Sequence, residues 1–462
     1  RKEILAVCLI VVGWGGSATA YDKTNLQALK VSGNCIGCDL SGADLSWLDL
    51  RGSELTDADL AGAVLFNTKL SGSRLVRAGL SGTDLRKMDL TAIKASGAWF
   101  KGADLSGADL TGASLSGANL VDADLSGSAI TGADLRYAHL DRVDLSGRDL
   151  RDTLLAGANL QSASIADSDL RGADLSGVNL TSADVRGARL TGAEFSHATL
   201  ASVDLSSLDL SGISFAGADF SGSTLTDTNL SGCNLQNAIL AAADLSKTKL
   251  SGSNLSDADL SGALIADVDL AGVQLAGANL SGADLSRASF KGKNLKGANI
   301  RGATVADVVW MDADLSDVDL SGIDFSGQDL SGTTLVGVHL RGTNLSGANL
   351  GGADLRGLDF SEKNLAQTSL VNARMEGAIF SQVDFNEADL RGAVFDEESV
   401  FTGEKTISSL KKAKGVNLDQ FCIESYPSAA NVPVCHVMPQ TMINAISCNS
   451  SDDSEPGPTC EL

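Results

Sequence analysis

The sequence predicts an all-β solenoid, and three observations support that prediction. Every position divisible by five from Leu40 to Phe395 holds a large apolar residue, with Ala95 as the one exception. The residue two places earlier is usually Ala, Ser, Thr or Val, and the residue between them is mostly Asp or Asn. A Ser-Gly-like pair follows the central residue. A register kept over so many units outranks any local signal of secondary structure.

Each five-residue unit is typical of three residues of strand followed by a corner. The central residue and the one two before it point inward, and the residue between them points outward, as in strand alternation. The pair after the centre turns the chain, because Gly tolerates backbone angles that other residues resist. A period of five matches neither a helix nor a continuous strand. We therefore expect stacked coils around a narrow, filled interior, with each coil contacting only its neighbours.

The units "ADLSG", "ANLSG" and "TDLRK" resemble those of the pentapeptide repeat family, whose pattern is A(D/N)LXX. The resemblance covers residues 38–397. It implies a right-handed quadrilateral β-helix with four pentapeptides per coil, which makes about 18 coils over this length.

A few units depart from the pattern. Ala95 replaces a large central residue, but Ile93 fills the neighbouring inward position, so the two positions exchange volume. Long polar residues take four other inward positions, where we expect them to reach out toward solvent at a corner. A local bulge or a bound anion is the alternative, because an unpaired buried charge is costly. These residues are Arg148, Lys293, Gln328 and Lys363.

Residues 1–20 are typical of a bacterial secretory signal. Arg1 and Lys2 precede the apolar run "ILAVCLIVVGW", and "ATA" precedes Tyr21 as a small-residue cleavage site. The run is short for a membrane span, so an uncleaved anchor is the less favoured interpretation. We expect an exported protein, periplasmic or extracellular, with no membrane span after signal removal.

The ends of the solenoid need caps, because they expose core and unpaired backbone. We expect an N-terminal cap over residues 21–37, with Leu26 and Leu29 of a short helix or turn over 22–31 facing the first coil. The β-helix then covers residues 38–400. A C-terminal capping helix is predicted over 401–415, where "SSLKKAKG" offers a Ser cap and a Gly stop. Residues 416–462 form a cysteine-containing, loop-rich tail.

Cleavage before Tyr21 leaves seven of the eight cysteines, and export permits disulfides. Cys35 and Cys38 form a Cys-x-x-Cys entry that we expect to close as a small disulfide, with a redox role as the alternative. Cys233 takes a small inward position and is predicted to be a buried, reduced thiol. Four tail cysteines are disulfide candidates whose pairing stays open, and zinc binding with His436 is the alternative. They are Cys422, Cys435, Cys448 and Cys460.

The formal net charge of −23 disfavours direct nucleic-acid binding, which needs a basic surface, and permits a basic partner. Outward Asp residues gather on one predicted face, where four carboxylates stack about 4.8 Å apart. Such a stack favours bound cations, raised carboxyl pKa values or a basic partner. The plainer interpretation is that the repeat simply prefers Asp there, with Arg86 and Arg136 near enough to soften the charge. The four are Asp84, Asp104, Asp124 and Asp144.

We predict no catalytic residue, cofactor or metal site. The filled interior leaves no pocket, and His139, His197 and His339 lie far apart in the sequence. We therefore expect a non-catalytic exported scaffold that binds an unknown protein partner through the acidic face or the tail. The alternative comes from the resemblance, since some family members are acidic DNA mimics that bind a type II topoisomerase. An enzyme built on the small, His-poor tail is disfavoured. The oligomeric state stays open.

Overall fold

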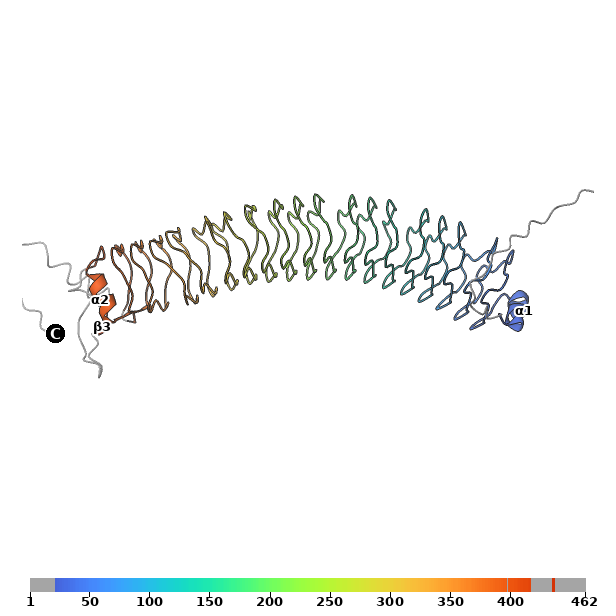
Figure 1. Cartoon of the computed structure of the whole chain (residues 1–462), viewed down its shortest axis with the longest axis horizontal. Helices are drawn as coiled ribbons and strands as arrows, with labels where there is room; N and C mark the ends of the chain where they lie inside the picture. Colours follow the sequence, from blue (N-terminus) through green and yellow to red (C-terminus); the bar gives the residue numbers. More distant parts are fainter. Residues whose placement is uncertain (1–20, 397, 417–433, 437–462) are drawn as a thin grey trace, which may run out of the picture. The chain divides into compact units, whose positions relative to one another are not determined.

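A computed structural model describes residues 21–396, 398–416 and 434–436 (Figure 1). The chain divides into two compact units, each described by itself. Unit 1 is Arg1–Leu145 with Asp152–Asn159, and unit 2 is Ser146–Arg151 with Leu160–Leu462. No helix within the described ranges is long and apolar enough to cross a membrane.

Both units are β-helices built from the same five-residue element. Outward residues along both units pair in parallel with the residue twenty positions later, as Asp39 does with Asp59 in unit 1 and Asn234 with Asn254 in unit 2. The backbone N–H of a central residue donates to the next coil, as in Leu105 to the Asp124 carbonyl at 2.8 Å. A spacing of twenty residues confirms four five-residue units per coil.

The interior is filled by the central residues and the small inward residues, which are buried along both units. Ala95 and Ile93 are both fully buried, and the ladder continues through them, with the Ala95 N–H donating to the Ser114 carbonyl at 2.7 Å. Buried hydroxyls also use the ladder, since Thr228 Oγ1 donates to the Leu205 carbonyl at 2.9 Å. Inward polar groups are thus tied to the neighbouring coil.

The long polar residues at inward positions are half-buried, and the corner pattern runs through them without a bulge. Gln328 Nε2 donates to the Val305 carbonyl at 3.2 Å. Arg148 Nε is buried without a hydrogen-bond partner among the described residues. Half-exposure agrees with side chains that reach from the core toward solvent, here Arg148, Lys293, Gln328 and Lys363.

The corners use left-handed backbone, which is why Gly recurs there. Gly157 has φ of 67° and Gly132 has φ of 66°, but Tyr137 adopts φ of 58° at the same kind of position. Its ring covers the glycine one coil later, because a Cβ at Gly157 would lie 2.5 Å from the ring of Tyr137. The Tyr137 ring therefore depends on the glycine twenty positions later.

Replacing Gly157 with alanine should destabilise unit 1 by about 1 kcal/mol more than the same change at Gly132. Both substitutions place an alanine on left-handed backbone, so that cost is common to both. Nothing lies within 4 Å of a Cβ at Gly132, whereas the Tyr137 ring must move for Gly157. Denaturant unfolding of the two variants measures the difference, and equal losses would contradict it.

Helix α1, Lys23–Ser32, closes the N-terminal end of unit 1. Asp22 caps it by accepting the Thr24 N–H at 2.7 Å, and Gly33 ends it with φ of 71°. Leu29 is buried, as predicted, while Leu26 is only half-buried. The first coil begins directly after α1, since the Cys35 N–H donates to the Glu54 carbonyl at 2.8 Å.

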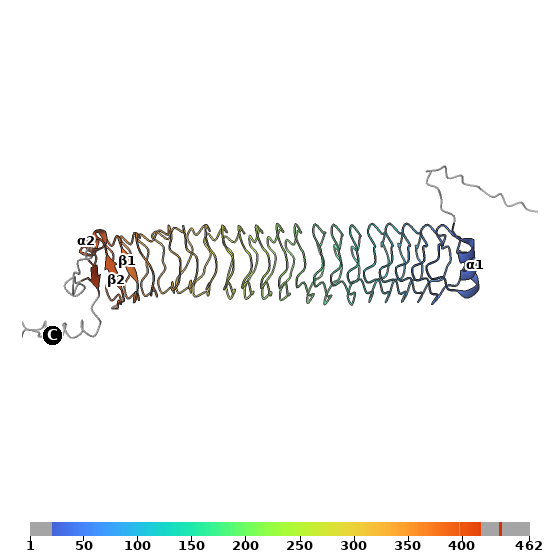
Figure 2. The same cartoon turned by 90° about the horizontal axis from the view of Figure 1, so that it is seen from below.

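Three short strands form a sheet at the C-terminal end of unit 2 (Figure 2). Strand β1, Ile379–Ser381, pairs in parallel with β2, Val400–Thr402. Strand β3, Val434–His436, pairs antiparallel with β2. Within the tail that the sequence predicts to be loop-rich, residues 434–436 therefore form a strand.

The C-terminal capping helix is shorter than predicted and lies within the predicted range 401–415. Helix α2 covers Glu404–Leu410, and its N-cap is Gly403 rather than a serine. The hydroxyls of the helix serve the β-helix instead, because Thr406 Oγ1 accepts the Val383 N–H at 2.8 Å and Ser409 Oγ accepts the Phe385 N–H at 3.0 Å. These bonds satisfy amides that the last coil would otherwise leave unpaired.

Candidate functional site

The outward Asp of a unit caps its own corner. Asp44 Oδ1 accepts the backbone N–H of Ser46 at 3.0 Å, and Asp104 Oδ1 accepts that of Ser106 at 3.0 Å. This is the hydrogen bond by which Asp and Asn side chains favour turns. The recurring Asp and Asn side chains therefore stabilise the corners of the coil, independently of any binding role.

We name Asp84, Asp104, Asp124 and Asp144 of unit 1 the acidic ladder. Asp84 pairs in register with Asp104, and Asp104 with Asp124, on successive coils. Arg86 bridges the first step, with Nη2 2.6 Å from Asp84 Oδ2 and Nε 3.4 Å from Asp104 Oδ2. The hydrogen bond from Arg86 lowers the pKa of Asp84, which is opposite to the raised carboxyl pKa that stacking alone suggests.

An Asp followed two residues later by Arg forms a fixed ion pair, which the sequence interpretation overlooked. In Asp49–Arg51, Nε donates to Oδ1 at 2.8 Å and Nη2 to Oδ2 at 2.6 Å. This hydrogen bond is the largest cause that lowers the pKa of Asp49 to about 2. The signal is the spacing Asp-x-Arg. The same two bonds hold Arg86, Arg136, Arg151, Arg171, Arg186, Arg356 and Arg391.

An exposed group of apolar side chains, Trp47, Val64 and Phe66, lies beside the ladder, and we name it the aromatic patch. Trp47 is 73% exposed and Phe66 is 63% exposed, with ring centroids 5.5 Å apart in an edge-to-face arrangement. Val64 pairs in register with Asp44. Val64 thus lies on the same side of the coil as Asp84, one coil before it. Trp47 also adopts φ of 66°, a conformation that is costly for a bulky residue. The fold gains little from an exposed tryptophan in this place.

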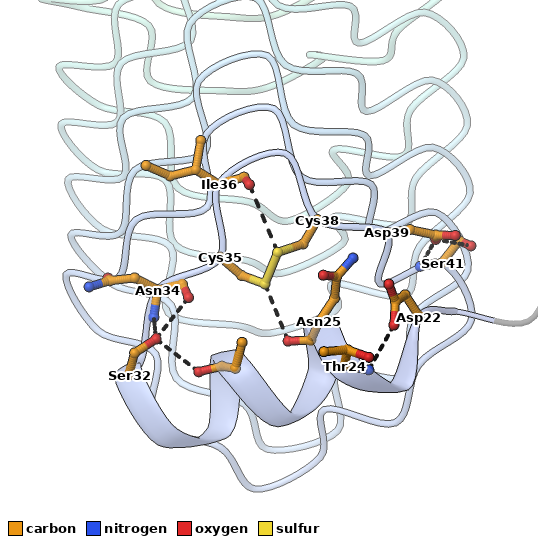
Figure 3. The surroundings of a disulfide bond; sticks show 11 residues. Asp22, Thr24, Asn25, Ser32, Asn34, Cys35, Ile36, Cys38, Asp39 and Ser41 are labelled. Carbon is orange, nitrogen blue, oxygen red and sulfur yellow. Dashed lines mark hydrogen bonds between the residues drawn. A yellow bond between two sulfur atoms is a disulfide. The ribbon is translucent and has the colours of Figure 1, made fainter.

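A disulfide joins Cys35 and Cys38 at the entrance to unit 1, with the Cα atoms 5.5 Å apart (Figure 3). Cys35 is buried, and its sulfur lies 3.3 Å from the backbone carbonyl oxygen of Asn25 in α1. The pair therefore lies between the helical cap and the first coil.

Models of one family match most of the chain between residues 33 and 396. The description "Pentapeptide repeat region" covers residues 223–300. The description "Pentapeptide repeats" covers 33–57, 58–94, 89–127, 98–136, 138–177, 179–217, 294–332, 324–361 and 359–396. The chain belongs to the pentapeptide repeat family.

Solved pentapeptide repeat structures are similar to parts of the chain. QnrB1, a plasmid-mediated fluoroquinolone resistance protein, is 18% identical, covers 42% of this chain and 91% of its own, and has a TM-score of 0.28. HetL is involved in heterocyst differentiation regulation in the cyanobacterium Nostoc sp. strain PCC 7120. It is 28% identical, covers 63% of this chain and 93% of its own, and has a TM-score of 0.16. Rfr23 from the cyanobacterium Cyanothece 51142 is 24% identical, covers 37% of this chain and 98% of its own, and has a TM-score of 0.11. No curated protein matches the chain.

Several predicted features of this pentapeptide repeat protein lie outside the described residues. They include the signal segment 1–20 and the tail cysteines Cys422, Cys448 and Cys460. Cys435 lies in β3, where its backbone pairs with Phe401 of β2. The disulfide and zinc interpretations of the tail therefore stay predictions.

The described parts of this pentapeptide repeat protein offer no metal-binding grouping. No three His, Cys, Asp or Glu residues among them gather to hold a metal ion. Cys233 is buried and free, its thiol donates to the Leu210 carbonyl at 3.0 Å, and burial raises its pKa to about 11. That thiol is protonated at neutral pH and unreactive. An apolar cavity inside unit 2, lined by leucines, Ile265 and Phe290, has about 10 Å³, which is too small for a substrate.

Proposed function

We propose that this protein is a non-catalytic, exported scaffold that binds a basic protein partner through unit 1. One observation carries the proposal: the aromatic patch continues into the acidic ladder on the same side of the coil. Val64 occupies the register position of the ladder, one coil before Asp84, and Trp47 and Phe66 lie at the corner beside it. The surface thus combines an apolar anchor with a row of carboxylates.

This combination suits a partner that presents an apolar side chain beside basic residues. Exposed tryptophan is enriched where a few residues carry most of the binding energy of an interface. The carboxylates attract a basic surface from a distance and align it along the coils. Trp47 shares its left-handed backbone with the other corner residues, so its exposure and its ring contact with Phe66, not its φ, support a role in binding.

Photo-cross-linking from position 66 in the source cells tests the proposal. A photoreactive phenylalanine analogue replaces Phe66, and the same analogue at Leu264 is the control. Leu264 is an exposed residue of unit 2 that occupies the same coil position as Val64. We expect one adduct specific to position 66, with a basic protein identified by mass. No adduct, or the same adduct from both positions, would overturn the proposal.

The change Trp47→Gly separates binding from stability. Glycine fits φ of 66°, so the relief of strain offsets the lost contact with Phe66, and the free energy of unfolding should stay within about 1 kcal/mol of the wild type. We expect the adduct at position 66 to fall at least fivefold in this variant. The matched control is Asn67→Gly, which changes a corner residue with φ of 54° and removes no aromatic ring. An undiminished adduct in Trp47→Gly would count against the patch.

Export has its own test, intact mass of the protein recovered from an exporting bacterial host, with and without reduction and alkylation. We expect a chain beginning at Tyr21 with Cys233 as its one thiol, open to alkylation only after unfolding, because it is buried. An uncut, fully reduced chain in the cytoplasm would overturn export. A gyrase supercoiling assay would then test the alternative function, an acidic DNA mimic that binds a type II topoisomerase.

A further inference from the structure

Two arginines of unit 2 depart from the Asp-x-Arg pairing. Arg301 follows Asn299, and Arg341 follows His339, at positions where the paired arginines follow an aspartate. Asn299 Oδ1 still accepts the backbone N–H of Arg301 at 3.1 Å, so the corner is intact. Within the described residues, neither guanidinium group forms an ion pair or a hydrogen bond. Both cations are therefore available to a ligand.

The two arginines flank an open hollow of about 680 Å³ on one corner of unit 2. They lie two coils apart, about 9.6 Å between equivalent backbone positions at the usual strand spacing. Glycines form the floor, and a Cβ at Gly302 or Gly322 would meet nothing within 4 Å. The lining residues are Arg301, Gly302, Asp319, Ser321, Gly322, Arg341 and Gly342.

The hollow is positive on a strongly acidic chain. Asp319 is the one carboxylate in its lining, and it already accepts the Ser321 N–H at 3.0 Å. Hydrogen bonds from Ser321 are the main cause that lowers the pKa of Asp319, and the charges of His339 and Arg301 lower it further. The lining therefore holds two guanidinium groups and one carboxylate, and that carboxylate already accepts the Ser321 N–H. The net charge of the hollow is positive.

We propose that this hollow binds a tetrahedral oxyanion, the phosphate or sulfate group of a ligand, between the guanidinium groups of Arg301 and Arg341. The planar fork of arginine donates two parallel hydrogen bonds to such a group. An anion placed between two side chains that are two coils apart is within reach of both. This site lies in unit 2 and does not depend on the protein-binding surface of unit 1.

Titration of the full chain with inorganic phosphate at low ionic strength, followed by calorimetry, tests the proposal. We expect one saturable site per chain in the wild type, and at least tenfold weaker binding in the double variant Arg301→Gln, Arg341→Gln. The control Arg356→Gln removes an arginine that Asp354 already holds through two hydrogen bonds, and it should change the affinity less than twofold. No saturable binding by the wild type would overturn the proposal.

A second double variant keeps both arginines but gives each a carboxylate partner, and it also removes the hydrogen bond that Asn299 Nδ2 donates to Asn279 Oδ1 at 3.1 Å. Asn299→Asp with His339→Asp restores the Asp-x-Arg spacing, so each guanidinium should pair with its own carboxylate. We expect the same loss of phosphate binding, and circular dichroism should show that the coil is retained, because Asp is common at this position. Unaltered binding in this variant would contradict the proposal.

The source of the anion is then distinguished by comparing inorganic phosphate, sulfate and phenyl phosphate on the wild type. Tighter binding of the ester supports a phosphate carried by a larger ligand, and tighter binding of either free ion supports an ion site. Equal loss of all three in both double variants places them in the same hollow. Retention of any of them in both variants would overturn the assignment to Arg301 and Arg341.

Discussion

Replacing Trp310 with alanine is expected to destabilise unit 2 by about 3–5 kcal/mol. Its side chain is fully buried inside the coil. It stacks on Phe290 with ring centroids 5.0 Å apart and meets the edge of Phe325 at 5.7 Å. Alanine would leave a cavity between two aromatic rings whose backbones are held by the ladder, so the site cannot collapse. Denaturant unfolding followed by circular dichroism measures the loss.

Two further variants make the Trp310 result specific. Trp99→Ala removes a tryptophan that is 54% exposed, and the free energy of unfolding should change by no more than about 0.5 kcal/mol. Trp310→Phe should cost much less than alanine, because it keeps a ring in place and removes an indole N–H that has no partner among the described residues. Similar losses for Trp310→Ala and Trp99→Ala would refute the packing argument.

Replacing Phe401 with alanine is expected to open the C-terminal end of unit 2. Phe401 of β2 is buried and stacks on Phe380 of β1 with ring centroids 4.7 Å apart, and it meets Phe395 at 5.3 Å. Loss of this ring should cost about 3–5 kcal/mol locally and release the pairing of β2 with β1. Because coils contact only their neighbours, the effect should fade along the unit.

Hydrogen exchange localises the expected effect of Phe401→Ala. Amide protection should fall by at least tenfold for residues 379–381 and 400–402, and should stay unchanged for residues 160–200 of the same unit. The control Phe66→Ala removes an exposed ring and should leave both segments protected. A uniform fall across unit 2 would show that the last coil does not unfold separately from the rest.

The repeat pattern predicts the coil because each five-residue unit repeats the same alternation of buried and exposed side chains. Cys35 and Cys233 are buried where the register places them, since an inward position allows little else. The outward position of the acidic ladder follows from the same register, whereas the Cys35–Cys38 disulfide is predicted from the Cys-x-x-Cys spacing. In these places local chemistry and long-range packing agree, so the sequence alone is sufficient.

The remaining features depend on geometry that the pattern does not contain. Ser409 was expected in the region of a helix cap, but its hydroxyl accepts the Phe385 N–H of the last coil instead. Whether Arg86 pairs with Asp84 depends on the backbone angles of the corner between them, which set the direction of the Arg86 side chain. The three residues of β3 carry no periodic signal, and their pairing with β2 requires a partner strand distant in sequence.

The twenty-residue register also limits how such a chain can lengthen during evolution. Duplication of any multiple of five residues keeps the central residues pointing inward, because every unit alternates in the same way. Only a multiple of twenty residues, a whole number of coils, also keeps each side chain on its own side of the coil. A duplication of five residues between Phe66 and Asp84 would move every later side chain by one side of the coil, and so separate the aromatic patch from the acidic ladder. The core therefore tolerates length changes that a binding surface does not.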